Sequence, residues 1–174
     1  MKQNKKSINA DVLQTASFLL PSQQKYFDII CIVVLLALGS YHSLLYFGHQ
    51  AVPNSDWPCF VETGKAVLAL KAPVDYKRAP VLGIMQIAIS KLMPGPYPEL
   101  AAGWLLNAIL HPLNLVLLWL IAKRIIGKAA VWFALIAGIN PYVIDMLRHP
   151  IAETTLLFFI LFTSYLIIIR SRWS

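Results

Sequence analysis

Long apolar runs separated by short polar segments dominate this chain. An α-helix rises about 1.5 Å per residue and needs about 20 residues to cross the roughly 30 Å of hydrocarbon in a bilayer. Four runs approach that length and predict transmembrane helices over residues 28–47, 101–122, 129–147 and 151–169. The third run reaches it only if residues 145–147 complete the helix. The pattern therefore predicts an all-α integral membrane protein with about four transmembrane helices.

Residues 48–100 connect the first two predicted spans, and no apolar stretch within them is long enough to cross a bilayer. Two stretches, Phe60–Leu70 and Val81–Leu92, have the pattern of amphipathic helices. The Asn54–Asp56 sequence offers helix caps before the first, and prolines end the second. Because each stretch has only about a dozen residues, we expect both helices to lie along the membrane interface.

Composition supports a membrane protein and argues against a nucleic-acid partner. Hydrophobic residues make up 58% of the chain and charged residues only 13%, whereas soluble domains have roughly 45–50% apolar residues. The formal net charge is +7, but most of the basic residues lie at the ends of apolar runs, and they form no stripe with interleaved aromatic residues. We therefore expect them to contact the anionic headgroups of membrane lipids.

The same basic residues predict the orientation of the chain. They occur in a tail of residues 1–25, after the second span and after the fourth: Lys2, Lys5, Lys6, Lys25, Lys123, Arg124, Lys128, Arg170 and Arg172. Cytoplasmic segments carry the excess of Lys and Arg, so we expect a cytoplasmic N-terminus and an extracytoplasmic loop 48–100. That loop also holds basic residues, but long loops count little in this rule.

Two acidic residues are candidates for catalysis on the extracytoplasmic side. Asp56 stands at the start of the first amphipathic helix, and Glu153 stands one turn into the fourth span. A carboxylate there can act as a general base on a hydroxyl group or bind a divalent cation such as Mg²⁺ or Mn²⁺. The alternatives are structural. Asp56 would cap a helix, and Glu153 would pair with Arg148 or with His149.

Basic and aromatic residues near these acids are candidates for substrate binding. Arg78, with Lys77 and Tyr76 beside it, would suit a phosphate, because a guanidinium makes bidentate contacts. Arg148 and His149 at the end of the third span are further candidates. Contact with lipid headgroups is the alternative for Arg78, and an ion pair with the nearby Asp145 is the alternative for Arg148.

A polar stripe runs along the second span. Asn107, His111 and Asn114 are spaced so that they share one face of a helix. Such a face usually turns toward the interior of a helix bundle or a cavity instead of lipid. Hydrogen bonds between helices near a kink at Pro112 are one interpretation, and a catalytic or transport role for His111 is the other.

Two stretches together resemble the N-terminal part of the GT-C glycosyltransferases, of the protein-mannosyltransferase and aminoarabinose-transferase type. They are PNSDWPCFVETGKAVLALKAPVDYKRAPVLGIM and INPYVIDMLRHPIAETTLLFFILFTSYL. The family shows an Asp after the first span, an aromatic, a small residue, a basic-then-Pro segment and an acid that opens the fourth span. These elements correspond to Asp56, Phe60, Gly64, Arg78 with Pro80, and Glu153.

The resemblance implies a GT-C-like transmembrane domain over residues 26–174 that moves a sugar from a polyprenyl-phosphate donor to an extracytoplasmic acceptor. It implies that Asp56 is the catalytic base or a metal-proximal acid and that Glu153 lies close to the active site. Arg78 would then hold the leaving phosphate. We expect a multi-pass protein of the plasma (inner) membrane.

The chain departs from that family by ending soon after the fourth span, whereas GT-C enzymes have more spans and several hundred more residues. We therefore expect a natural short form, a fragment, or a site that something else completes. One alternative function is a non-catalytic membrane subunit or lipid-phosphate-binding partner of another membrane protein. Another is a small transporter with Asn107, His111, Asn114 and Glu153 as its polar path.

Overall fold

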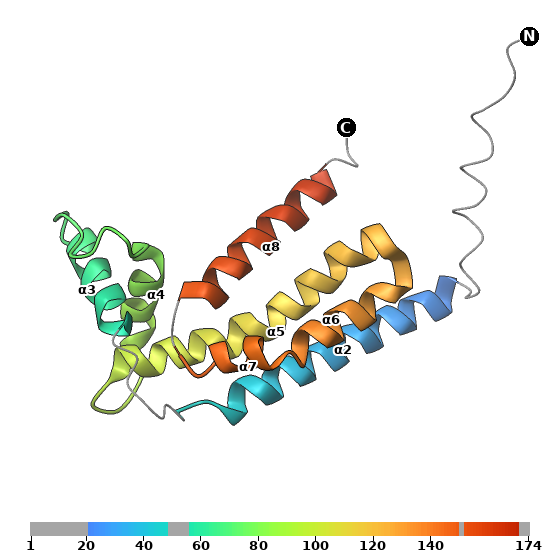
Figure 1. Cartoon of the computed structure of the whole chain (residues 1–174), viewed down its shortest axis with the longest axis horizontal. Helices are drawn as coiled ribbons and strands as arrows, with labels where there is room; N and C mark the ends of the chain where they lie inside the picture. The colour runs from blue at the N-terminus through green and yellow to red at the C-terminus, as the bar shows by residue number, and fades with distance from the viewer. Residues whose placement is uncertain (1–20, 49–55, 150–151, 171–174) are drawn as a thin grey trace, which may run out of the picture. The chain divides into compact units, whose positions relative to one another are not determined.

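The computed structural model describes residues 21–48, 56–149 and 152–170, and within these residues the chain is helical without strands. The helices are α2 (Pro21–Leu45), α3 (Asp56–Leu68), α4 (Pro80–Ser90), α5 (Pro98–Ile126), a 3₁₀ turn (Gly127–Ala129), α6 (Ala130–Gly138), α7 (Pro141–Met146) and α8 (Ala152–Arg170) (Figure 1). The chain divides into two compact units, Met1–Val33 and Val34–Ser174. All tertiary contacts described below lie within the second unit.

Among the described residues, three helical segments are long and apolar enough to cross a membrane: Ser22–Leu45, Pro98–Gly138 and Ala152–Arg170. This confirms an all-helical fold, within the described residues, whose long helices have the length and composition of membrane spans. In α8, the two threonines of the first turns, Thr154 and Thr155, are buried, whereas Leu156, Phe159 and Ile160 are exposed. Polar residues inside and apolar residues outside are what a lipid environment favours.

The third predicted span is not one helix. The described chain breaks between α6 and α7 at Asn140 and Pro141, where Asn140 has an extended ψ of 119° and its side chain accepts a hydrogen bond from Tyr142 N. Proline has no N–H and its ring clashes with the preceding helical turn, and the residue before it is disfavoured in the helical region. The prediction of a continuous helix over residues 129–147 is therefore wrong. The other helices also begin or end a few residues from the predicted bounds, most clearly α2, which begins at Pro21 instead of residue 28.

The chain between α5 and α8 runs back along α5. Gly127 ends α5 with φ of 65°, a conformation that other residues rarely adopt, and so permits the tight turn into α6. Gly138 at the end of α6 lies against the side chains of Leu38 and Leu115. Beyond α7, the side-chain amide of Asn107 donates to the carbonyl oxygen of His149 at 2.9 Å. The chain that follows α5 therefore runs back along this helix, from its last turn to its N-terminal third.

Helices α3 and α4 occur over about the residues where two amphipathic helices are predicted, and they cross at two glycines. A Cβ atom on Gly64 would lie 2.7 Å from the carbonyl carbon of Gly83, and one on Gly83 would overlap the carbonyl oxygen of Phe60. The two backbones are therefore in direct contact. Phe60 and Leu82 pack with Leu106 of α5 in one buried cluster, which fastens the helix pair to α5.

Candidate functional site

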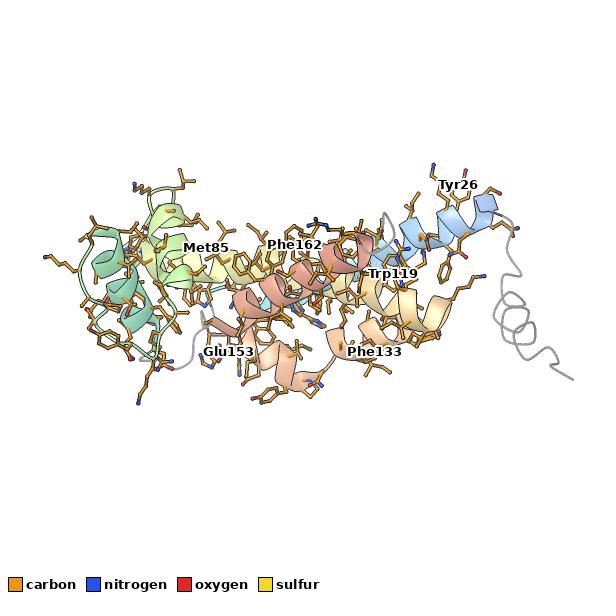
Figure 2. All side chains as sticks on the ribbon, turned by 90° about the horizontal axis from the view of Figure 1, so that it is seen from above. Tyr26, Met85, Trp119, Phe133, Glu153 and Phe162 are labelled. Carbon is orange, nitrogen blue, oxygen red and sulfur yellow. The ribbon has the colours of Figure 1, made fainter. Side chains whose placement is uncertain are left out.

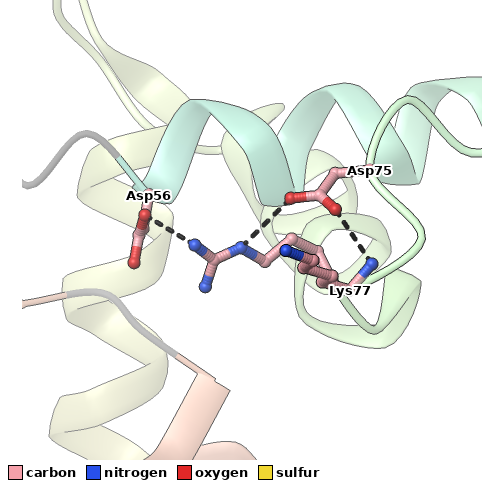
Figure 3. A network of polar contacts seen from close by, with 4 residues as sticks. Asp56, Asp75 and Lys77 are labelled. Carbon is pink, nitrogen blue, oxygen red and sulfur yellow. Dashed lines mark hydrogen bonds and ion pairs between the residues drawn. The ribbon is translucent and has the colours of Figure 1, made fainter.

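The guanidinium of Arg78 lies between two carboxylates (Figure 3). Its Nη2 donates to Asp56 Oδ1 at 2.7 Å, and its Nε lies 3.5 Å from Asp75 Oδ2, an ion pair too long for a hydrogen bond. The guanidinium carbon also stands 5.2 Å from the centre of the Phe60 ring. We call Asp56, Asp75 and Arg78 the Arg78 cluster. It holds Asp56, one of the two predicted catalytic acids, and Arg78, a predicted substrate-binding residue.

A turn before α4 positions Arg78. The Asp75 side chain accepts from Lys77 N at 2.9 Å, and the Asp75 carbonyl oxygen accepts from Arg78 N at 3.2 Å. Such an Asx turn is typical of Asp at the start of a tight turn. The sequence prediction missed Asp75, although an Asp three residues before a basic residue and five before Pro80 is a signal of this kind.

The charges of the cluster do not balance. Two carboxylates face one guanidinium, so the cluster carries one net negative charge when all three groups are ionised. The side chains of Arg78 and Asp56 are 31% and 37% exposed, and ion pairs this exposed stabilise a fold by only about 0–1 kcal/mol. The pairs therefore serve mainly to orient the groups. Arg78 Nη1 makes no hydrogen bond or ion pair in the described part of the chain.

Lys77 and Tyr76 do not join the cluster. Tyr76 is 81% exposed and the Lys77 side chain is also exposed, so only the backbone of Lys77 contributes to the turn. Their role in substrate binding stays a prediction.

Glu153 lies on the first turn of α8 and is exposed (Figure 2). Arg148 pairs with Asp145 at 3.3 Å, and its guanidinium carbon stands 5.0 Å from the centre of the Tyr46 ring. The ion pair with Asp145, the structural alternative for Arg148, is therefore present, whereas Arg148 and Glu153 form no ion pair within the described residues. His149 contributes its carbonyl oxygen to the Asn107 hydrogen bond, and its buried Nδ1 has no partner among the described residues.

The polar face of α5 turns inward as predicted, and Asn107, His111 and Asn114 are each 3% exposed. The Asn114 side-chain amide donates to the carbonyl oxygen of Thr154 at 3.0 Å, and Asn107 donates to that of His149. Hydrogen bonding between segments is therefore confirmed for both asparagines. His111 and Asn114 also line a cavity of about 110 Å³ that Glu153 borders.

A second cavity, of about 100 Å³, lies between α4 and α8. Its lining is apolar except for Thr155 and includes Ala79, the residue after Arg78. The lining residues are Ala79, Val81, Leu82, Ala152, Thr155, Leu156 and Phe159. An apolar space thus adjoins the Arg78 cluster.

The residues predicted to hold a metal ion fall into different surroundings. Asp56 belongs to the Arg78 cluster, whereas Glu153 borders the cavity beside α5. Across residues 21–48, 56–149 and 152–170, no three His, Cys, Asp or Glu side chains are grouped as metal ligands would be. Magnesium is commonly held by one or two carboxylates together with waters and substrate phosphates, so a divalent cation that arrives with a substrate stays a prediction.

No protein-family model, curated protein or solved structure matches this chain. The resemblance to the GT-C glycosyltransferases therefore rests on the residues of the two stretches named above.

Proposed function

We propose that this protein is a GT-C-type membrane glycosyltransferase, which moves a sugar from a polyprenyl-phosphate donor to an acceptor hydroxyl on the extracytoplasmic face. The observation that carries the proposal is the pairing of Asp56 with Arg78 at 2.7 Å beside an apolar cavity. A base, an anion-binding cation and a space for a lipid chain are what such a transfer requires.

The proposed topology has four crossings of the plasma membrane, with a cytoplasmic N-terminus. Because the chain after α5 returns to the level of Asn107, α6 and α7 together form the third crossing in two pieces. Broken spans are tolerated where they lie inside a bundle or beside a cavity. Helices α3 and α4 lie at the extracytoplasmic interface.

The donor phosphate binds at Arg78. Nη1 offers two N–H groups on the guanidinium edge that the carboxylates do not use. A phosphate beside two carboxylates needs further positive charge, which Lys77 on the same turn or a divalent cation such as Mg²⁺ supplies. The isoprenoid chain enters the cavity behind Ala79. A lipid tail in the bilayer is already in an apolar medium, so its entry into this cavity gains no hydrophobic driving force. The cavity therefore distinguishes one lipid chain from another by shape.

In the transfer, Asp56 accepts the proton of the acceptor hydroxyl, and the acceptor oxygen attacks the anomeric carbon from the face opposite the phosphate. The bond between that carbon and the phosphate oxygen breaks, and its electron pair leaves with the polyprenyl phosphate, whose charge Arg78 stabilises. The configuration at the anomeric carbon inverts. Glu153, Arg148 and His149 border the acceptor side.

The test uses the full chain in nanodiscs with a radiolabelled polyprenyl-phosphate sugar. Asp56→Asn should bind donor but lower turnover by about 10²- to 10⁴-fold, the usual contribution of a general base. Arg78→Ala should weaken donor binding. Glu62→Gln is the matched control, because Glu62 is an exposed acid on the same helix outside the cluster. Turnover of Asp56→Asn near that of the wild type would refute the catalytic role.

A non-catalytic subunit or lipid-phosphate-binding partner of another membrane protein is the second candidate. It is favoured by the direct ion pair, since a carboxylate that serves only to orient Arg78 would look the same. Donor binding that depends on Arg78, with no transfer to any acceptor in the wild type, would support this function over the enzyme.

A further inference from the structure

The cavity between α5, α7 and α8 is mostly apolar, but two of the side chains that border it carry polar atoms without partners among the described residues. It has a volume of about 110 Å³, several times what one water molecule needs. His111 and Asn114 are each 97% buried at its wall, and His111 Nε2 and Asn114 Oδ1 have no hydrogen-bond partner among the described residues. Buried polar groups are nearly always satisfied, so two such atoms beside one cavity mark a place where water or a polar ligand binds.

The two atoms without partners, His111 Nε2 and Asn114 Oδ1, are hydrogen-bond acceptors. Asn114 donates its Nδ2 to the carbonyl oxygen of Thr154 at 3.0 Å, and because a carbonyl can only accept, the orientation of the amide is fixed and Oδ1 is the acceptor. The neutral imidazole of His111 carries one acceptor nitrogen, and a donor in the cavity selects the tautomer in which it is Nε2. The Glu153 carboxylate at the cavity makes no hydrogen bond or ion pair within the described residues.

Three acceptors and one negative charge define the ligand. A phosphate or other anion would be repelled by Glu153 and would meet only the hydroxyl groups of Tyr142 and Thr154 as donors. Alkali and alkaline-earth ions prefer an all-oxygen shell, which the imidazole nitrogen does not supply. A primary ammonium has three N–H donors, no acceptor and one positive charge, and so matches the set one to one. The apolar side chains of Val143, Met146 and Leu157 suit the carbon chain behind it.

We infer that this cavity binds a primary ammonium group, with His111 Nε2, Asn114 Oδ1 and Glu153 each accepting one N–H. The group belongs either to a lipid headgroup, as in phosphatidylethanolamine, or to a free amine. The break between α6 and α7 lets α7 line the cavity as a short separate helix, and broken helices border ligand sites in other membrane proteins. The inference does not depend on the proposed transferase activity.

The test measures thermal unfolding of the full chain by tryptophan fluorescence. In phosphatidylcholine nanodiscs, ethylammonium chloride should raise the Tm, whereas tetramethylammonium chloride and NaCl at the same ionic strength should not, because neither cation has an N–H donor. In a second arm, nanodiscs that contain phosphatidylethanolamine should raise the Tm above that in phosphatidylcholine alone.

Glu153→Gln should weaken binding at least about tenfold, the expected loss for a charge-assisted hydrogen bond. Glu62→Gln is the control. His111→Gln keeps an acceptor and should retain binding, whereas His111→Leu should lose it, so the result does not rest on one variant.

A response to ethylammonium alone assigns a free amine, and a response to phosphatidylethanolamine alone assigns a headgroup. Either result supports the inference. It is overturned if folded wild type responds to neither, if tetramethylammonium or NaCl acts equally, or if Glu153→Gln binds as wild type does.

Discussion

The crossing of α3 and α4 predicts that Gly83→Ala destabilises the protein, although alanine is the better helix former. A Cβ atom at this position would overlap the carbonyl oxygen of Phe60 and lie 2.6 Å from its carbonyl carbon. Both are backbone atoms that cannot rotate away, so the helices must separate. Alanine gains about 1 kcal/mol in helix propensity, whereas overpacking costs about 1–3 kcal/mol, occasionally more. With backbone on both sides, we expect a net loss of about 1–2 kcal/mol.

Thermal unfolding in nanodiscs measures this loss, with Gly138→Ala as the matched control. A Cβ on Gly138 would lie 2.9 Å from Leu38 Cδ2 and 3.0 Å from Leu115 Cδ1, which are the ends of flexible side chains, so that variant should lose less. Separation of α3 from α4 also pulls Asp56 from Arg78, and donor binding should weaken with no change of charge. A Tm of Gly83→Ala equal to or above that of the wild type would refute the backbone contact.

Three further substitutions test the contacts that organise the rest of the fold. Asn107→Leu leaves the carbonyl oxygen of the returning chain without its buried donor and should lower the unfolding free energy by about 2–3 kcal/mol, measured by denaturation. Asn140→Ala removes the side-chain cap of α7 and should cost about 1 kcal/mol by the same measurement. Arg78→Lys keeps the charge but loses the planar fork between Asp56 and Asp75, so the Tm should change little while donor affinity falls about tenfold in a binding assay. An unchanged affinity would contradict the role of the fork.

Much of the helical layout could be predicted because it follows from patterns local in the sequence. Apolar length alone predicts the long helices, and the spacing of Asn107, His111 and Asn114 predicts an inward face, because side chains three or four residues apart share a helix surface. The pair of Asp145 and Arg148 is likewise local, at a spacing of three residues.

The misses have two causes. The break at Pro141 was hidden because apolar residues continue on both sides of it, and hydropathy does not register a missing N–H, although Asn followed by Pro is a turn signal. Two further features depend on tertiary packing. These are the ion pair of Asp75 with Arg78 and the cavity that His111, Asn114 and Glu153 share. No periodicity in one segment reports which side chains of another segment will face it.

Several described features of the second unit lie along α5 between Leu106 and Asn114. Leu106 packs on the helix pair that carries the Arg78 cluster, Asn107 holds the returning chain, and Asn114 borders the cavity with Glu153. Toward the other end, Lys123 stands 5.1 Å over the Trp119 ring, an arrangement typical of an anchor at the membrane interface. Under the proposed orientation, that end is cytoplasmic. Both binding proposals then concern residues packed on one helix, so a ligand-induced shift of α5 would affect both sites. Cross-titration of donor and ethylammonium would reveal such coupling as a reciprocal change in affinity, and independent binding would show that α5 does not link the sites.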